Sequence, residues 1–199
     1  MIVVIACGRV SDTSANGQAP TASAARTSPS VQASTPSPIY ADRCTAGQLN
    51  LDQAPQRFTE PQEQSSLSLR LTNVSSSGCY LDGYPKVDLL DGAGRILPFQ
   101  YADGGDMVVT PRPPGHVDLA PGGIGYVTIN HNLCENGDVA DATGIRLTPP
   151  GEVSALALLN AGHLMTFCGA SGVPGDTVYV SPLEPTFSAT LQPDMGGGY

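Results

Sequence analysis

The sequence predicts an all-β fold, an antiparallel β-sandwich with two disulfides that is preceded by a disordered stalk. Three observations predict it. Apolar and polar residues alternate over many short segments, clusters of Gly and Pro separate these segments, and four of the five cysteines lie after residue 43. Alternation with a period of two is typical of half-buried strands, and many short strands between turns favour a sandwich or a barrel.

The first seven residues end in a pattern that is typical of a bacterial lipoprotein signal peptide. Val4-Ile5-Ala6 precedes Cys7, which would be diacylated after cleavage and become the new N-terminus. A secretory signal has a basic start and an apolar core of about 7–15 residues, so we expect the natural start to lie upstream of Met1. The alternative is an apolar N-terminus beside an ordinary cysteine. The lipoprotein interpretation predicts a protein outside the cytoplasm, lipid-anchored to the cell membrane or otherwise in the envelope or secreted.

Residues 8–43 are predicted to be a disordered stalk. Of the 28 residues at positions 11–38, 21 are Ser, Thr, Ala or Pro, and Val31 is the only larger aliphatic residue. So little apolar surface cannot offset the entropy lost on ordering the chain. The folded domain is therefore expected at residues 44–191, followed by a flexible tail at 192–199.

The domain is strongly acidic, which excludes several classes of partner. The chain has 18 acidic and 9 basic residues, and residues 1–43 hold only two of the former and three of the latter. The remaining 16 acidic and 6 basic residues give a net charge of −10 from residue 44 onward. Nucleic-acid binding depends on basic patches, so no nucleic-acid partner is expected. The membrane is expected as a partner only through a lipid on Cys7.

The four remaining cysteines are Cys44, Cys79, Cys134 and Cys168, and an even number in an exported chain suggests two disulfides. Three connectivities are compatible with four cysteines. We favour the sequential one, because Cys44–Cys79 and Cys134–Cys168 close loops of similar length. A zinc site is the rival interpretation, but structural zinc usually uses closely spaced cysteine pairs.

The alternation locates the strands. Leu67, Leu69 and Leu71 point one way in the segment 66–72, and Asp91-Gly92-Ala93-Gly94 turns one strand into the next. Strands are expected at residues 66–72, 87–89, 95–97, 116–119, 125–131, 144–148, 154–158, 163–168, 177–181 and 186–191. Residues 153–164 could form a helix, but we favour a strand there. Because the chain has no Trp, its likeness to immunoglobulin domains is one of architecture, as an Ig-like sandwich.

Several landmarks resemble an actinobacterial family of exported lipoproteins that is catalogued as a domain of unknown function. The most specific is Cys79-x-Leu81-x-Gly83-Tyr84-Pro85. The others, in order, are Cys44, Leu71-Thr72-Asn73, Asp91-Gly92-Ala93-Gly94, Ala120-Pro121-Gly122-Gly123 before Tyr126-Val127, Cys134, Pro149-Pro150-Gly151, Cys168 and Val180-Ser181-Pro182-Leu183. The resemblance covers about residues 44–185. It implies a β-sandwich with two disulfides and an envelope location, and it brings no assigned activity.

No residue is predicted to be catalytic, and no cofactor or metal is expected. Gly169-Ala170-Ser171-Gly172 lacks the last glycine of a nucleophile elbow, because residue 173 is Val. His116 and Asp118 share one face of a strand, as metal ligands can, but no third ligand accompanies them, and His131 and His163 are expected at the surface or at a strand end. Acidic loop residues could gather around Ca²⁺, although solvated charges are the simpler interpretation; they are Asp103, Asp106, Glu135, Asp138 and Asp141.

The predicted function is therefore a non-enzymatic binding or structural role in the cell envelope, with an envelope protein or glycan as partner. The alternatives are an envelope hydrolase acting on glycan or peptide, and a carrier of a small apolar ligand. We expect binding in loops, chiefly 99–115 with an exposed Tyr101, and 132–143. The candidate binding residues are Tyr84, Tyr101, Asp103, Asp106 and His116, although Tyr84 also fits a structural role as a corner residue.

Overall fold

The computed structural model describes residues 39–134, 139–169 and 176–195. Predictions that fall on other residues lie outside the described part of the chain. These are the lipidation of Cys7, the signal 1–7, the stalk up to residue 38, the acidic residues Glu135 and Asp138, and the end of the tail. Within the described residues, no helix has the length and hydropathy that a membrane span requires.

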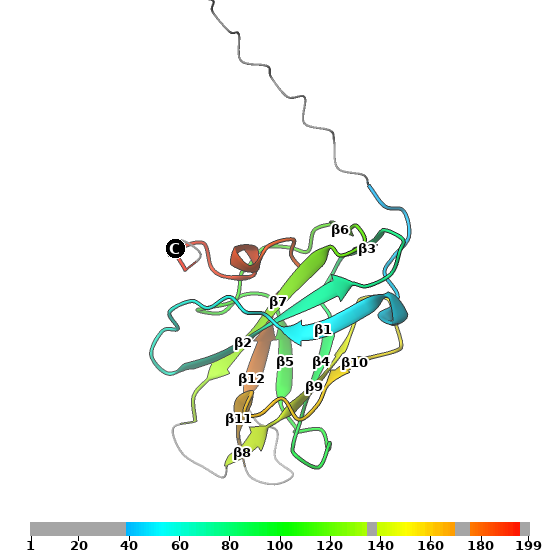
Figure 1. The fold of residues 1–199 in the computed structure, drawn as a ribbon. Helices are drawn as coiled ribbons and strands as arrows, with labels where there is room; N and C mark the ends of the chain where they lie inside the picture. Colours follow the sequence, from blue (N-terminus) through cyan, green and yellow to red (C-terminus); the bar gives the residue numbers. More distant parts are fainter. Residues whose placement is uncertain (1–38, 135–138, 170–175, 196–199) are drawn as a thin grey trace, which may run out of the picture. The chain divides into compact units, whose positions relative to one another are not determined.

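One sheet of the sandwich has five strands, in the order β1-β2-β7-β12-β5 (Figure 1). They are β1 (Leu49–Gln53), β2 (Gln64–Asn73), β7 (Ile124–Asn132), β12 (Thr177–Val180) and β5 (Gln100–Asp103). The predicted antiparallel β-sandwich is confirmed, with the difference that one pair of this sheet, β12 with β5, runs parallel. Alternation shows which side of a strand is buried, but it does not show in which direction the neighbouring strand runs. Because β5 and β12 are far apart in sequence, no tight hairpin joins them, and so they can pair in parallel.

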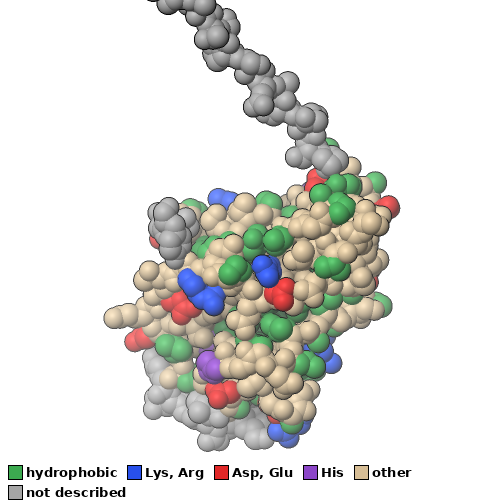
Figure 2. All heavy atoms as spheres, viewed as in Figure 1, with side chains coloured by type: hydrophobic (Ala, Val, Ile, Leu, Met, Phe, Trp, Pro, Cys, Tyr) green, Lys and Arg blue, Asp and Glu red, His purple; other side chains and the backbone are tan. Residues whose placement is uncertain are grey.

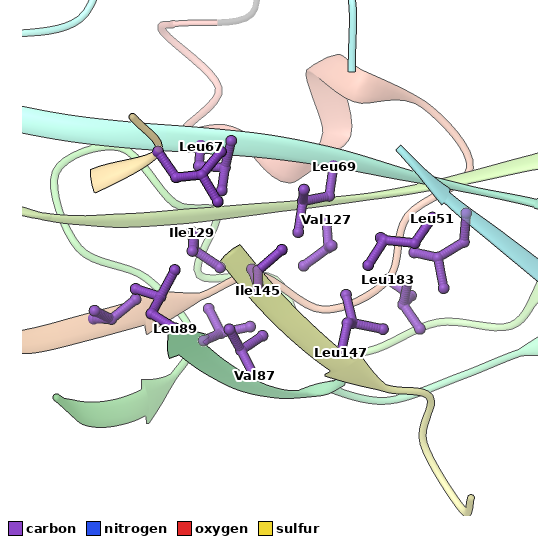
Figure 3. Packing of buried hydrophobic residues seen from close by; sticks show 14 of the residues in the cluster. Leu51, Leu67, Leu69, Val87, Leu89, Val127, Ile129, Ile145, Leu147 and Leu183 are labelled. Carbon is purple, nitrogen blue, oxygen red and sulfur yellow. The ribbon is translucent and has the colours of Figure 1, made fainter. Parts of the chain in front are cut away.

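The second sheet has three strands in the order β10-β9-β4, and its inner face packs against the five-stranded sheet. They are β10 (Leu156–Leu158), β9 (Gly144–Thr148) and β4 (Lys86–Leu90). Figure 3 shows the side chains that meet between the sheets; Leu67, Leu69, Val127 and Ile129 come from β2 and β7, and Val87, Leu89, Ile145 and Leu147 from β4 and β9. The predicted alternation of residues 66–72 and 125–131 is confirmed, because every second residue of these strands lies in this core.

A two-stranded sheet lies at each end of the sandwich, and each end carries one disulfide (Figure 1). At one end β3 (Cys79–Leu81) pairs with β6 (Val117–Leu119), and Cys44 bonds to Cys79 with their Cα atoms 4.9 Å apart. At the other end β8 (Val139–Ala142) pairs with β11 (Met165–Cys168), and Cys134 bonds to Cys168 across 5.3 Å. The predicted sequential pairing is confirmed, and two disulfides indicate an oxidising, extracytoplasmic environment.

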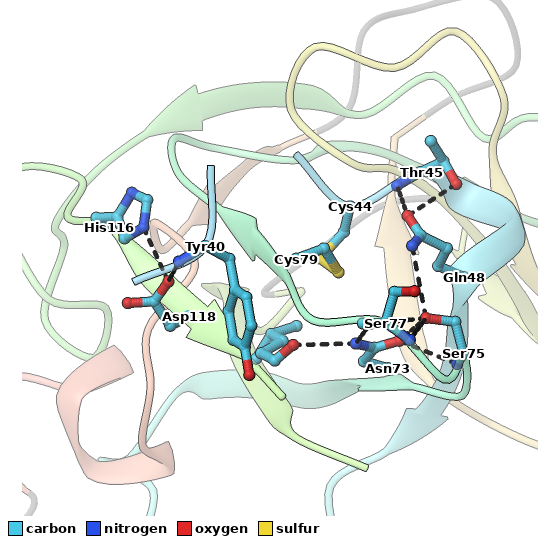
Figure 4. The surroundings of a disulfide bond; sticks show 11 residues. Tyr40, Cys44, Thr45, Gln48, Asn73, Ser75, Ser77, Cys79, His116 and Asp118 are labelled. Atoms are coloured by element: carbon cyan, nitrogen blue, oxygen red, sulfur yellow. Dashed lines mark hydrogen bonds and ion pairs between the residues drawn. A yellow bond between two sulfur atoms is a disulfide. The ribbon is translucent and has the colours of Figure 1, made fainter. Parts of the chain in front are cut away.

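The last residues of the predicted stalk belong to the folded domain (Figure 4). The amide of Tyr40 donates to Asp118 Oδ1 at 2.8 Å, and the amide of Tyr80 in β3 donates to the carbonyl of Asp42 at 2.9 Å. The Tyr40 ring covers Gly78, where an added Cβ would lie 1.9 Å from the ring. Residues 40–43 thus run along β3 into Cys44 and the 3₁₀ turn η1 (Ala46–Gln48), so the domain begins a few residues earlier than predicted.

The prediction of a strand at 186–191 is wrong, because residues Phe187–Thr190 form the 3₁₀ turn η2. Both edges of the nearby strand β7 are already occupied by β2 and β12, so no partner is left for another strand. The chain instead crosses the outer face of the five-stranded sheet. There Thr190 Oγ1 lies 2.7 Å from Thr128 Oγ1, and both residues are fully buried.

Candidate functional site

The structure separates the five predicted binding residues into three places. Tyr84, Tyr101 and Asp103 line one cleft of about 300 Å³ together with Asp88 and Val180. It lies where β4, an edge strand of one sheet, approaches β5, an edge strand of the other. Asp106 and His116 lie elsewhere, so the predicted residues do not form a single site.

Tyr101 is a structural residue and is half-buried, which corrects the prediction that it is exposed. Its hydroxyl accepts a hydrogen bond from the backbone amide of Leu89 at 2.9 Å and so ties β5 to β4. Burial raises the pKa of Tyr101 to about 12, which keeps the phenol neutral. Burial also raises the pKa of Tyr84, and the charges of Asp103 and Glu184 add to that rise. The cleft is therefore small, its charged lining residues are Lys86, Asp88 and Asp103, and one of its tyrosines has a structural partner.

Asp106 is also structural, and the loop that contains it is not the free loop that was predicted. Residues 99–115 begin with β5, and Val108, Val109 and Thr110 are fully buried. Asp106 Oδ1 accepts hydrogen bonds from the amides of Val108 and Val109 at 2.8 and 2.7 Å, and its Oδ2 accepts one from the Asn130 side chain. The composition of Gly, Pro and Asp is typical of a loop, but here the Asp106 carboxylate fastens the segment to the sheet, together with a hydrogen bond from the Gly104 amide to the Val180 carbonyl at 3.0 Å.

This segment and η2 cover a layer of polar side chains on the outer face of the five-stranded sheet. Asn130 donates to Gln64 Oε1 at 2.7 Å, and Ser66 donates to Asn130 Oδ1 at 2.7 Å. Ser68 and Thr128 share a hydrogen bond of 2.8 Å. Polar and apolar residues alternate in these strands, as they do in strands with one solvated face. Here the polar face is covered instead, and the polar side chains just named form hydrogen bonds with one another.

His116 helps to attach the start of the domain. Its Nε2 lies 3.1 Å from Asp118 Oδ1, so the predicted pairing of these residues on one strand face is confirmed. The imidazole stacks on Tyr80 with ring centroids 4.3 Å apart, and Arg43 lies 5.3 Å from the same ring. Because Asp118 also accepts the amide of Tyr40, this group holds the entering chain against β3 (Figure 4).

A cavity lies at the end of the sandwich where β8 and β11 pair, away from the point at which the chain enters at residues 39–44 (Figure 1). Its volume is about 680 Å³. It is lined by residues 62–64 at the start of β2, residues 132–134 at the end of β7, and Met107, Cys168, Gly169 and Asp176. We call this cavity the distal hollow.

The lining of the distal hollow combines amides, carboxylates and exposed apolar side chains. Gln64 Nε2 donates to Asn132 Oδ1 at 2.9 Å, which leaves the remaining groups of the Asn132 amide for other partners. Glu63 has a φ of 64°, a conformation that is uncommon for residues other than glycine and that places it at a sharp turn before β2. Met107 and Leu133 are 64% and 45% exposed. Such a mixture of polar groups and apolar surface is typical of binding sites.

Sequence reasoning found this site only in part. The loop 132–143 was predicted to bind, and its first residues do line the hollow. Met107 also lies in a predicted binding loop, residues 99–115, whereas Glu63 and Asp176 were missed, because they come from distant segments and carry no motif of their own. Only the β2–β7 and β12–β7 pairings bring these segments to one end of the sandwich.

His131 lies behind the wall of the distal hollow. It is the penultimate residue of β7, as predicted for a strand end, but it is 0% exposed and not on the surface. Its ring meets the edge of Phe99 with centroids 5.6 Å apart, and neither ring nitrogen has a hydrogen-bond partner among the described residues. Burial lowers the pKa of His131, and the charge of Asp176 and the neighbouring backbone of Asn132 oppose this shift.

Comparison with known protein families identifies the family to which this chain belongs. The family described as a domain of unknown function (DUF4232) matches residues 44–184, which include both disulfides and most of the lining of the distal hollow. Searches of the curated proteins and of the solved structures gave no match. Since the family covers well over half of the sequence, the chain belongs to the DUF4232 family.

Proposed function

We propose that this protein is a non-catalytic binding protein of the cell envelope, anchored by a lipid on Cys7, that takes its ligand in the distal hollow. One observation carries the proposal. The hollow lies at the end of the sandwich opposite the end where the chain enters the domain at residues 39–44 (Figure 1). A domain tethered through its N-terminus would therefore present the hollow away from the membrane.

The compartment supports this arrangement. The two disulfides fit an oxidising environment, and Val4-Ile5-Ala6-Cys7 is typical of a lipoprotein cleavage site. Only the lipid would attach the protein, because a domain with so many carboxylates is repelled by anionic headgroups. The segment rich in Ser, Thr, Ala and Pro would serve as the tether between the lipid and the domain.

The lining of the hollow indicates the chemistry of the ligand. Glu63 and Asp176 are its described charged residues, and they favour a neutral or cationic ligand over an anionic one. The amides of Gln62 and Asn132 can donate and accept hydrogen bonds, and Met107 offers apolar surface. A glycan or a polar peptide segment of an envelope protein fits this set better than a small apolar ligand does.

The surface charge agrees with that choice. On the face seen in Figure 2, basic side chains lie singly beside acidic ones and form no continuous basic patch among the described residues. Basic side chains of the described residues also form ion pairs, among them Arg70 with Asp52 at 3.6 Å and Arg146 with Asp88 at 3.5 Å. Nucleic acid is for this reason not among the partners that we propose.

We expect negative charge placed in the hollow to abolish the binding of a neutral ligand without unfolding the domain. Met107→Glu with Leu133→Glu adds two carboxylates at exposed positions of the lining, so the fold tolerates them while a neutral ligand loses its apolar contact. NMR titration with soluble oligosaccharides from the host cell wall, and with short polar peptides, measures the binding. Val153→Glu, at a 98% exposed site outside the hollow, is the matched control. Binding that survives the double substitution, or shifts that map elsewhere, would contradict the proposed site.

Lipid anchoring has its own test. Expressed with a functional lipoprotein signal peptide ahead of Cys7, the protein is expected to partition into detergent and to incorporate labelled fatty acid, because diacylated Cys7 supplies the anchor. Cys7→Ala should release the protein or leave it unprocessed. Lipid labelling that is unchanged in this variant would refute the anchor, and it would leave the proposal for the hollow untouched.

A hydrolase is the second candidate, and one observation favours it. Glu63 and Asp176 line the same hollow, and a pair of carboxylates is the usual equipment for cleaving a glycosidic bond. In that case new reducing ends would appear during the oligosaccharide titration, and Glu63→Gln or Asp176→Asn would stop their release. Binding without turnover would instead support the non-catalytic role.

A further inference from the structure

We propose that reduction of the Cys134–Cys168 disulfide turns the wall of the distal hollow into a zinc site made of Cys134, Cys168, His131 and Asp176. This goes beyond the proposed function, because it does not depend on which ligand the hollow takes. The site would exist only in the reduced protein, and it would link the redox state of one disulfide to metal binding.

Geometry is the first support. One ligand atom each from His131, Cys168 and Asp176 lies within 4.8 Å of the other two. The sulfur of Cys134 is bonded to that of Cys168 and so lies in the same small volume. Four donors of the kinds that zinc prefers, two sulfurs, one imidazole and one carboxylate, therefore converge from β7, the residues directly after it, β11, and the residue before β12.

The oxidation state decides whether these donors can act together. Thiolates bind zinc, whereas the sulfurs of a disulfide are bonded to each other and are poor ligands. The oxidised protein therefore offers only the imidazole and one carboxylate. A dithiol reductant would pass two electrons and two protons to the disulfide and become a disulfide itself. Zn²⁺ would then displace the two thiol protons, and the four ligands would complete a tetrahedral set.

The environment of His131 is the second, independent support. It is fully buried, and neither ring nitrogen makes a hydrogen bond of standard geometry to a described residue, although the backbone of Asn132 lies close enough to influence its pKa. A buried polar group without a partner is costly and asks for an explanation. Coordination of a metal through one nitrogen would supply the missing partner, and the edge contact with Phe99 already restrains the ring.

The position of the site also provides a route for the metal. Cys134, Cys168 and Asp176 line the distal hollow, and Asp176 is exposed, so an ion reaches the donors from solvent. The other disulfide differs in this respect. Cys44 and Cys79 are 0% and 1% exposed, whereas Cys168 is 8% exposed and lines the hollow, so a reductant reaches the first pair less easily. Mild reduction should therefore open Cys134–Cys168 first.

The experiment uses the full chain with Cys7→Ser, so that no fifth thiol competes. After mild reduction, alkylation and mass spectrometry establish which cysteines are free. Zn²⁺ affinity is measured by competition with a chromophoric chelator, and Co²⁺ reports thiolate ligands by its visible spectrum. We expect one Zn²⁺ per reduced chain, a thiolate–Co²⁺ absorption, and affinity for the oxidised chain at least about 100-fold weaker, since two of four ligands are lost.

Matched variants separate the site from other histidines and thiols. His131→Phe and Asp176→Asn should each weaken Zn²⁺ binding by roughly 10- to 100-fold or more, by analogy with losses at supporting residues of metal sites. His163→Phe, which removes an exposed histidine paired with Asp141, should leave the affinity unchanged. Circular dichroism of each variant in the oxidised state verifies that it is folded before reduction.

Three results would overturn the proposal. One is reduced protein that binds Zn²⁺ no more tightly than a Cys134→Ser, Cys168→Ser variant does. Another is unchanged affinity in both His131→Phe and Asp176→Asn. The third result applies if the reduced chain loses its fold. Zinc should then restore the circular dichroism signal of the β-sheet, and failure to restore this signal contradicts a metal-stabilised site.

Discussion

Replacing Cys44 and Cys79 together by alanine is expected to lower the free energy of unfolding by roughly 3–4 kcal/mol. The bridge closes a loop with a sequence separation of 35 residues, and the chain-entropy model gives this loss for a loop of that length. Alanine is the right replacement, because both cysteines are buried and a serine hydroxyl there would lack solvent. Since domains are typically stable by about 5–15 kcal/mol, one such loss consumes a large fraction of the total.

Urea unfolding monitored by circular dichroism measures this effect, and the Cys134→Ala, Cys168→Ala variant is the matched comparison. The second disulfide has a sequence separation of 34 residues, so its removal should lower the free energy of unfolding by a nearly equal amount. The two variants should differ locally. Only the first loosens the strap formed by residues 40–43, so the Tyr80 amide, which donates to the Asp42 carbonyl, should lose its protection from hydrogen exchange. Stability unchanged in either variant would contradict the entropic account of these bridges.

Asp106→Ala is expected to cost about 3 kcal/mol or more, an unusually large effect for an acidic residue outside the core. The substitution removes the acceptor of the Val108 and Val109 amides and leaves the fully buried Asn130 amide without one of its partners. Each buried donor left without an acceptor costs roughly 1–3 kcal/mol. Thermal and urea unfolding measure the loss.

Two further variants make this prediction specific. Asp106→Asn keeps one acceptor oxygen at the same place and should recover a large part of the stability. Asp103→Ala changes an exposed carboxylate in the same segment and should stay within about 0.5 kcal/mol of the parent. A loss for Asp103→Ala as large as that for Asp106→Ala would show that the segment is sensitive in general and not through these hydrogen bonds.

The same hydrogen bonds change what can be expected from shortening this part of the chain. As a loop, residues 99–115 would tolerate trimming, and only binding would be lost. In the structure they contain β5, the edge strand that pairs with β12, and the fully buried Val108–Thr110 stretch. Trimming them would remove a strand and uncover the polar layer over β2 and β7, so the domain is expected to unfold.

The sequence by itself determined the fold class, most strands and the compartment. Leu67, Leu69 and Leu71 recur with a period of two, and this pattern has one structural solution, a strand with its apolar face in a core. The even number of cysteines after residue 43 pointed to two disulfides, and their similar spacing favoured the pairing that is observed. The alternation is a local property of the chain, and the number and spacing of the cysteines follow directly from the sequence. Both can therefore be recognised without a structure.

The direction of β5, the covered polar face and the distal hollow were decided by the tertiary structure alone. The alternation in β2 shows that one side of this strand is polar. It does not show that η2 and residues 104–112 cover this side. Glu63, Asp176 and His131 lie more than 40 residues from one another in sequence and meet only because β2 and β12 both pair with β7. Contacts of this kind depend on strand order and on the direction of each connection, and neither leaves a periodic trace in the chain.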